Sequence, residues 1–346
     1  MKLKKVLALF MAMVFAVGLL AGCGSSTTEE PTQTTAAEVA EPTQPGEEEN
    51  YLKMLTLGNS GAVDCGHMLA YVAATEGYEN FKVATLYYSG CSLTQHVGFM
   101  SQNAAEYKLY VSSTEDPNNP PTIMNEVTMQ QALRYDYWDI IIMQGSSWEI
   151  ACQETTIESN IQALQKYARE NCLNPYAKFV WHMGWVAPTD NTLLDTYPYP
   201  ENNVYYTRYL TFGNSRDNFY NAVVKCNQEK IVPDDTFQYI IPTGTAMENA
   251  LTSYFEESDI HRDYYHATDL ARVMVSYVWM CRLFGIEQLD ELKVDHIPAS
   301  LFKSTQGTQD YVFTEAEKNV MLEAINNALA TPFAVTQSQY TTAPTE

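Results

Sequence analysis

The sequence predicts an α/β protein, a three-layer α/β/α sandwich built around a five-stranded, mainly parallel sheet. Two observations indicate this fold class: short apolar runs recur along the chain, and helical segments separate them. Four of the five runs have continuous apolar cores rather than alternating polar and apolar residues, which is typical of strands buried on both faces of a parallel sheet. Alternation of strand and helix favours right-handed crossovers between two covering layers of helices.

The predicted elements follow in chain order. Strands are expected at residues 53–57, 82–87, 139–143, 178–183 and 236–241, of which the last has the most mixed composition. Helices are expected at residues 64–76, 157–170 and 217–229. A further helix is expected at residues 268–284, where apolar side chains recur every three or four positions and Gly285 follows as a helix stop. We find no internal repeat and predict no second domain.

The N-terminal residues indicate an export signal rather than part of a fold. A lysine-rich start precedes a nearly unbroken apolar stretch at residues 6–20, and the run Leu-Ala-Gly-Cys then ends at Cys23. This order is typical of a secretory signal peptide, here residues 1–22. The Cys after Leu-Ala-Gly resembles the lipobox of bacterial lipoproteins, which implies lipidation of Cys23. The alternative is an ordinary signal peptide with an incidental cysteine.

The two ends of the mature chain are expected to lie outside the folded domain. Residues 23–50 are rich in Thr, Glu, Ser, Pro and Ala and contain no Lys, Arg or aromatic residue. Such a segment cannot bury enough apolar surface to offset its ordering entropy, so we expect a disordered acidic tether. Residues 331–346 are similar and are expected to form a loose tail. Residues 51–330 are enough for one large α/β domain.

The charge of the chain limits its partners. It has 20 Lys and Arg against 42 Asp and Glu, which gives a formal net charge of −22 at pH 7. Cleavage of the predicted signal peptide would make this charge more negative, because residues 1–22 contain three Lys and no acidic residue. A surface this acidic disfavours nucleic acid and anionic lipid headgroups. We therefore expect no nucleic acid partner, a membrane contact only through the N-terminal lipid anchor, and neutral or cationic substrates in an extracytoplasmic location.

Six cysteines remain after the predicted lipidation site, namely Cys65, Cys91, Cys152, Cys172, Cys226 and Cys281. None are spaced as Cys-x-x-Cys, which disfavours a zinc ribbon or a thioredoxin-like site. An extracytoplasmic compartment permits disulfides, but sequence cannot choose the pairing. We favour the pair Cys65–Cys91, because both residues lie near loops expected at the active site.

Two long segments interrupt the simple strand and helix alternation. Residues 92–130 contain a turn-rich break, and residues 186–212 carry several prolines and a cluster of tyrosines. Both leave the carboxyl ends of predicted strands, where loops build the ligand crevice of open α/β sheets. We expect both segments to wall the site. The alternative is that the two segments are surface loops outside the site. For residues 92–130 this alternative fits the sequence as well as a place in the wall does.

A serine lies at the end of the first predicted strand, in Gly58-Asn59-Ser60. Gly58 lets the backbone turn tightly, and Gly61 keeps the space beside the serine hydroxyl open. The helix that follows directs its free N–H groups and the positive end of its dipole toward Ser60, which favours an oxyanion. Taken alone, the motif is also consistent with an ordinary turn.

An Asp-x-x-His pair, Asp263 and His266, lies about 200 residues further along the chain. A three-residue gap puts both side chains on one face of a turn. A serine hydroxyl needs an imidazole to take its proton, and that imidazole needs an acceptor to fix its tautomer. The alternative is a solvated loop at a helix start, in which Asp263 is a cap.

Together these motifs resemble the SGNH, or GDSL-like, hydrolases over about residues 52–285. The resemblance also rests on Gly-Cys-Ser-Leu-Thr-Gln-His, Met-Gln-Gly-Ser-Ser, Trp-His-Met-Gly-Trp and Ile-Pro-Thr-Gly-Thr-Ala, a set similar to one uncharacterised bacterial lipoprotein branch. It implies a flavodoxin-like sandwich in which Ser60 is the catalytic nucleophile, His266 the base and Asp263 its partner.

The resemblance also implies an oxyanion hole formed by the backbone N–H groups of Ser60 and Gly90 and by a third donor. The superfamily usually supplies that donor from Gly-x-Asn-Asp, but this chain has Gln-Gly-Ser-Ser from residue 144 onward. Gln144 is the predicted donor, because it has the same amide on a longer arm, and Ser147 is the alternative. The first block has Asn59 in place of Asp, which should not disturb the nucleophile.

His182 and Trp185 are candidate substrate-binding residues, because they follow the fourth predicted strand at its carboxyl end. A buried structural role is the alternative for His182. No His-x-Asp-His or His-Glu-x-x-His spacing occurs, so we expect neither a metal nor another cofactor.

The predicted function is that of an extracytoplasmic, lipid-anchored serine esterase that removes acetyl or other small acyl groups from carbohydrate. The expected substrate is a small acyl ester or an acetylated glycan; the 24 tyrosines fit stacking on sugars as well as ordinary core filling. The alternative is a non-catalytic carbohydrate- or solute-binding lipoprotein with the same fold.

Overall fold

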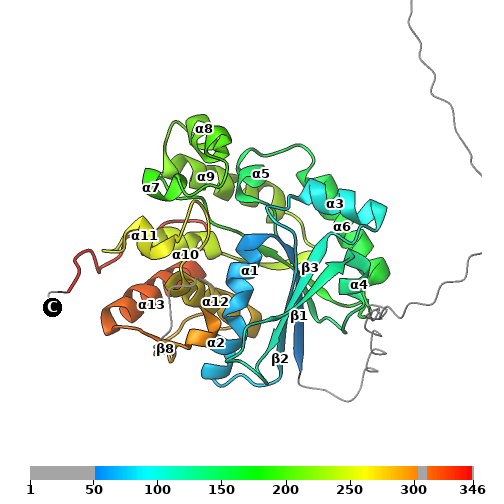
Figure 1. The fold of residues 1–346 in the computed structure, drawn as a ribbon, viewed down its shortest axis with the longest axis horizontal. Coiled ribbons are helices and arrows are strands. Elements are labelled where there is room, and N and C mark those ends of the chain that lie inside the picture. The colour runs from blue at the N-terminus through cyan, green and yellow to red at the C-terminus, as the bar shows by residue number, and fades with distance from the viewer. Residues whose placement is uncertain (1–50, 303–309, 345–346) are drawn as a thin grey trace, which may run out of the picture. The chain divides into compact units, whose positions relative to one another are not determined.

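The computed structural model describes residues 51–302 and 310–344. The predicted signal peptide, Cys23 and the predicted tether lie outside these residues. The strands of the main sheet are β1 Leu52–Gly58, β2 Phe81–Tyr87, β3 Tyr107–Ser113, β4 Thr122–Val127, β5 Ile140–Met143, β6 Lys178–His182 and β7 Phe237–Ile241. Their order across the sheet is β4-β3-β2-β1-β5-β6-β7. Figure 1 labels the neighbouring strands β1, β2 and β3. A second, two-stranded sheet pairs β8 His296–Ile297 with β9 Tyr311–Val312.

The helices lie between and after these strands. The α-helices are α1 Ser60–His67, α2 Leu69–Thr75, α3 Leu93–Gln102, α4 Met129–Leu133, α5 Ser147–Ala151, α6 Ile157–Asn171, α7 Asn191–Leu194, α8 Val204–Thr211, α9 Arg216–Cys226, α10 Thr243–Ala250, α11 Glu257–Ile260, α12 Asp269–Phe284 and α13 Glu315–Ala330. Short 3₁₀ turns occur at Pro200–Asn202 and Ala299–Leu301, and a π-helical turn at Asn227–Ile231 continues α9. None of the helices within the described ranges is long and apolar enough to cross a membrane.

The five predicted strands form the parallel centre of the sheet. Strand β1 pairs in parallel with β2 and β5, and β5, β6 and β7 continue the same direction. The side chains of β5 are buried on both faces, as the continuous apolar run Ile-Ile-Ile-Met predicts. The predicted α/β class with a mainly parallel sheet is therefore confirmed.

The sheet has two more strands than predicted. Residues 92–130 do not wall the site: they supply α3 and then β3 and β4, which extend the edge of the sheet in antiparallel fashion beside β2. The turn-rich break is the connection of this β3–β4 hairpin. The strands were missed because β4 is mostly exposed and β3 is interrupted by Lys108 and ends in two serines, so neither has a long continuous apolar run.

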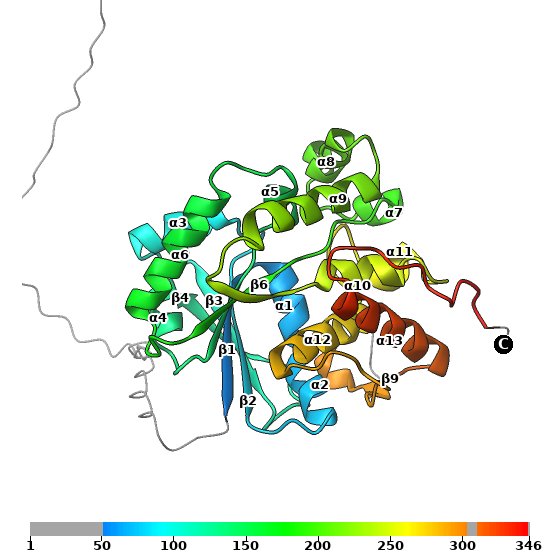
Figure 2. The same cartoon turned by 180° about the vertical axis from the view of Figure 1, so that it is seen from behind.

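Helices cover both faces of the sheet and enclose two hydrophobic cores. One core packs α1, α2, α10, α12 and α13 against one face, and the other packs α3, α5, α6 and α9 against the opposite face (Figures 1 and 2). Helix α12 has the predicted bounds: the Thr268 side chain caps its first turn, and Gly285 ends it at φ 70°. The three-layer arrangement follows from these two cores.

The segment after Thr331, expected to be loose, packs against the domain. The backbone N–H of Thr336 donates to Asn249 Oδ1 at 2.8 Å, and the N–H of Tyr254 donates to the carbonyl of Tyr340 at 2.9 Å. The prediction was wrong because a polar composition does not exclude backbone hydrogen bonds to a neighbouring helix.

The predicted disulfide between Cys65 and Cys91 is absent. All six cysteines of the described chain are free. Cys65 belongs to the core on one face of the sheet and Cys91 to the core on the other face. The sheet therefore separates two residues that both follow neighbouring strands in the sequence.

Candidate active site

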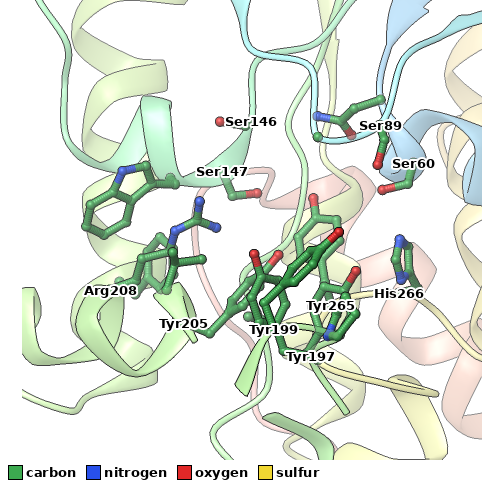
Figure 3. Close-up of a pocket in the computed structure, with 18 residues that line it drawn as sticks. Ser60, Ser89, Ser146, Ser147, Tyr197, Tyr199, Tyr205, Arg208, Tyr265 and His266 are labelled. Atoms are coloured by element: carbon green, nitrogen blue, oxygen red, sulfur yellow. The ribbon is translucent and has the colours of Figure 1, made fainter. Parts of the chain in front are cut away.

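A pocket of about 410 Å³ opens at the carboxyl ends of β1, β2, β5 and β6. Three turns from the sheet line it, at Asn59–Ser60, Ser89–Gly90 and Ser146–Trp148. The predicted 186–212 wall and the loop Tyr264–His266 complete it (Figure 3). The expected position at the carboxyl rim of a parallel sheet is thus the observed one.

Ser60 is the first residue of α1, and Asn59 holds the turn before it. The Asn59 side chain accepts from the backbone N–H of Gly61 at 3.0 Å and donates to the carbonyl of Cys91 at 3.1 Å. The second bond joins the turn after β1 to the turn after β2. A carboxylate cannot donate, so Asn at this position makes a link between the two turns that Asp could not make.

Asp263 and His266 form the hydrogen-bonded pair that their spacing predicts. The ring Nδ1 of His266 lies 2.9 Å from both carboxylate oxygens of Asp263, and the backbone N–H of His266 also donates to this carboxylate at 2.8 Å. Burial tends to raise the pKa of Asp263, but hydrogen bonds from His266 outweigh it, so the pKa lies below its usual value. The carboxylate is therefore ionised near neutral pH and fixes Nδ1 as the donor.

The Ser60 hydroxyl and the His266 ring face each other across one end of the pocket (Figure 3). Asp263 contacts the ring through Nδ1, so Nε2 is the ring nitrogen left for the serine. No hydrogen bond joins Ser60 to His266 among the described residues; in enzymes without substrate such bonds are often long and tighten when substrate binds. The structure thus brings the three predicted residues to one rim.

A buried carboxylate holds the Asp-x-x-His segment against the sheet. Asp64, on α1, accepts from the backbone N–H of Ala267 at 3.0 Å and from Arg272 Nη2, on α12, at 2.7 Å. Arg262 also contacts Asp64, at 3.3 Å. Asp64 and Arg272 have fully buried side chains. Because α1 also begins with Ser60, this ion pair links the element of the serine to the segment of the histidine.

The two predicted backbone oxyanion donors line the pocket. Gly90 has a φ of 61°, in the left-handed region, and its missing side chain leaves open space. No hydrogen-bond acceptor within the described residues contacts the N–H of Ser60 or of Gly90. Both groups are therefore free to donate to a ligand.

The structure does not place Gln144 in the pocket lining. Its side chain is 1% exposed and lies beneath the first turn of α1, where its Oε1 accepts weakly from the N–H of Asn59 at 3.4 Å. Its Nε2 has no partner among the described residues and lies where a Cβ atom at Gly61 would crowd it. The longer side chain of Gln therefore places its amide below the pocket instead of in its lining. Ser147, the alternative donor, does line the pocket, and its hydroxyl donates to the carbonyl of Trp185.

His182 and Trp185 are not substrate-binding residues in this structure, because both are buried. His182 is 1% exposed, packs against Trp279 and contacts Cys65 Sγ at 3.7 Å, and burial lowers its pKa to about 3. Trp185 is fully buried and stacks on Tyr265, whose carbonyl accepts from its indole N–H at 2.8 Å. Trp185 therefore supports a pocket residue rather than the ligand.

An ion-pair network fixes the 186–212 wall. Arg216, at the start of α9, donates to both carboxylate oxygens of Glu248 at 2.8 and 2.9 Å and to Glu257 at 3.0 Å. Glu257 in turn accepts from the backbone N–H groups of Thr189 and Asp190. The wall is thereby tied to α10 and α11, next to the Asp-x-x-His segment.

Several pocket residues were not identified individually from the sequence. They are Ser89, Trp148, Arg208, Phe219, Tyr264 and Tyr265. Tyr264 and Tyr265 lie inside the Asp-x-x-His motif, and Arg208 is the one basic residue in the tyrosine-rich 186–212 segment. Their positions inside these two segments could have identified them as pocket residues. The remaining residues have no pattern that separates them from core aromatic residues.

A serine, an Asp–His pair and two free N–H groups at the carboxyl rim of a mainly parallel α/β sandwich define an SGNH-like arrangement. The chain belongs to the DUF4886 family: the model of that family, described as a domain of unknown function, matches residues 53–304. No curated protein was found to match the chain.

One of three similar solved structures supports this fold. A crystal structure of a DUF4886 family protein from Bacteroides uniformis ATCC 8492 has a TM-score of 0.66 and 22% identity, covering 83% of this chain and 98% of that one. A proposed SGNH hydrolase from Slackia heliotrinireducens has a TM-score of 0.42 and 17% identity, covering 66% and 97%. A Clostridium thermocellum family 3 carbohydrate esterase has a TM-score of 0.36 and 10% identity, covering 68% and 98%. The first likeness shows the fold, and the other two are too weak to add to it.

Proposed function

We propose that this protein is a serine esterase that removes acetyl or other small acyl groups from carbohydrate. One observation carries the proposal: Ser60 faces His266 in a single pocket, and His266 is held by Asp263 although about 200 residues separate the serine from the pair. A serine hydroxyl becomes nucleophilic when an oriented imidazole takes its proton.

The reaction follows from these contacts. His266 Nε2 takes the Ser60 proton as Ser60 Oγ attacks the ester carbonyl, and Asp263 stabilises the imidazolium that forms. The free N–H groups of Ser60 and Gly90 donate to the tetrahedral oxyanion. His266 returns the proton to the leaving alcohol, and water then releases the acyl group from Ser60, with His266 again as base. Ser147 also lines the pocket, but its hydroxyl would have to release the carbonyl of Trp185 before it could serve as a third donor.

The pocket walls support a carbohydrate substrate. Tyr197, Tyr199 and Tyr205 come from the 186–212 wall, and Tyr264 and Tyr265 come from the Asp-x-x-His segment that packs against it. Aromatic rings combined with polar tips suit the mixed apolar and polar faces of a sugar. The pocket volume of about 410 Å³ accommodates one small sugar unit with its acyl group.

We also propose that the enzyme is lipid-anchored through Cys23 on the outer side of the cell membrane. The signal-like residues 1–22 and the Leu-Ala-Gly-Cys run support this location. Incorporation of labelled palmitate into the full chain, and its loss in Cys23→Ser, would establish the anchor. Equal labelling of both proteins would refute it.

Ser60→Ala tests the chemistry. We expect kcat for hydrolysis of 4-nitrophenyl acetate to fall more than about a thousandfold, because the nucleophile is lost. Ser101→Ala, on the exposed surface of α3, is the matched control and should keep full activity. Unchanged activity in Ser60→Ala would exclude this mechanism. If the wild type cleaves no ester yet binds sugars, the protein is a binding protein instead.

A further inference from the structure

The charge of the pocket differs from that of the molecule. The chain has a net charge of −22 and more than twice as many acidic as basic residues. The pocket lining nevertheless contains no Asp or Glu among the described residues, while Arg208 and His266 both contribute to it. His266 belongs to the proposed reaction, so Arg208 is the charged group whose role is not yet explained.

The guanidinium of Arg208 is held between two aromatic rings. Its central carbon lies 4.8 Å from the ring centre of Tyr205 and 5.2 Å from that of Trp148. Such stacking occupies the faces of the planar guanidinium and leaves its N–H groups at the edge. Figure 3 shows this edge directed into the pocket, on the side of Ser147.

No carboxylate of the described chain neutralises Arg208, and none of its N–H groups makes a hydrogen bond there. Glu149, the residue after Trp148 in α5, accepts from the backbone N–H groups of Leu93 and Thr94. Asp195, near α8, accepts from the hydroxyl of Tyr206. The acids around the pocket are thus engaged elsewhere, and the guanidinium retains its capacity for an anionic ligand.

Arg208 and Ser60 lie at opposite ends of the pocket, with the labelled tyrosines ranged between them (Figure 3). A ligand whose ester is at Ser60 would place its far end at Arg208 and its ring along the tyrosines. A planar guanidinium pairs best with a carboxylate, through two parallel hydrogen bonds. We propose that the substrate is an acylated acidic sugar, whose carboxylate binds Arg208 while its ester meets Ser60. This inference rests on the proposed esterase function.

An anionic substrate differs from the neutral or cationic substrates expected from the net charge of the chain. An acidic surface repels anions at long range, but this effect is screened within about a Debye length of 8–10 Å in physiological salt. A half-buried guanidinium at contact distance acts at much shorter range and is screened less. The pocket can therefore select an anion that the rest of the surface disfavours.

A matched pair of substrates tests the proposal: an O-acetylated methyl glucuronoside and its carboxyl methyl ester, which is neutral. We expect wild-type kcat/KM to be higher for the free acid by about tenfold or more, the scale of one charge-assisted hydrogen-bonded pair. In Arg208→Gln this ratio should fall to about one, and Arg208→Lys should restore part of it. Arg134→Gln, at an exposed arginine after α4, is the control and should keep the wild-type ratio.

A second pair of esters tests which part of the substrate carries the charge. 4-Nitrophenyl hemisuccinate has its carboxylate on the acyl group, and 4-nitrophenyl acetate has none. A preference for hemisuccinate that depends on Arg208, without one for the acetylated glucuronoside, would overturn the acidic-sugar assignment. An equal rate for the acid and neutral glucuronosides in the wild type would also overturn it.

Direct binding separates this inference from the proposed function. Methyl glucuronoside is titrated by calorimetry into the wild type, Ser60→Ala and Arg208→Gln. If no ester is cleaved but binding depends on Arg208, the esterase proposal fails and the acidic-sugar site stands. If esters are cleaved without any preference for the acid, the esterase stands and the acidic-sugar site fails. Absence of both cleavage and binding refutes both.

Discussion

At the residue scale, the functional distinction lies between side chains that reach the pocket and side chains that support it. The Ser60 and His266 side chains face each other in the pocket, whereas the Asn59 side chain joins the two turns that carry Ser60 and Gly90. Asp263 lies behind His266 and contacts its ring through Nδ1. Substitutions in these two groups should therefore change activity in different ways.

Asp263→Asn should lower kcat on 4-nitrophenyl acetate by about 10³–10⁴-fold, the scale found when such a carboxylate is replaced by an amide. The amide no longer stabilises the imidazolium, and it can impose the wrong ring tautomer on His266. Steady-state kinetics measures the effect. Asp290→Asn, at an exposed aspartate, is the control and should not change kcat. A loss below about tenfold would show that Asp263 does not orient the base.

At the scale of elements, the site depends on how α1 and α12 hold the Asp-x-x-His segment. Asp64 of α1 binds both Arg272 of α12 and the backbone beside His266. A buried ion pair of this kind does little for stability compared with apolar packing, but removing one partner leaves an uncompensated buried charge. Removing one partner should therefore lower the free energy of unfolding more for this ion pair than for a surface ion pair.

Asp64→Asn should lower the free energy of unfolding by about 3 kcal/mol, because buried Arg272 loses one of its two counter-charges among the described residues and keeps only Asp269. Glu158→Gln, which removes the exposed partner of Lys230 at 3.2 Å, should change it by less than about 1 kcal/mol. Urea denaturation followed by circular dichroism measures both values. Similar losses in the two variants would mean that Asp64 does not anchor the segment.

At the scale of the whole molecule, buried histidines make stability depend on pH. Burial lowers the pKa of His96 to about 4 and that of His182 to about 3, and it also lowers the pKa of His261 well below 6.5. The folded protein keeps all three neutral, whereas the unfolded chain protonates them near 6.5. Stability from these groups is thus complete above about pH 6.5 and is lost as the pH falls toward the folded pKa values.

The free energy of unfolding should therefore decrease steadily between about pH 6.5 and pH 4, with a slope approaching 4 kcal/mol per pH unit if all three histidines contribute. Urea titrations at several pH values in this range give the slope. His96→Phe should make it shallower, while His296→Asn, at an exposed histidine, should leave it unchanged. A free energy independent of pH would contradict the burial of these rings as neutral groups.

The sequence by itself determined the features that depend on local pattern. Short apolar runs, four of them continuous, predicted the five parallel strands, and three-to-four spacing with Gly285 predicted α12. A three-residue gap predicted the contact between Asp263 and His266. These predictions succeeded because each depends on a few neighbouring residues. Burial of a strand depends on its own apolar run, and a contact across one turn depends on the spacing of its two residues.

Only the tertiary structure decided what depends on the packing of distant segments. It placed Gln144 under α1, His182 and Trp185 in the interior, and Arg208 in the pocket. It also put Cys65 and Cys91 on opposite faces of the sheet. The same residue types occur in cores, on surfaces and in sites, so their roles follow from their neighbours in space, which local sequence does not specify.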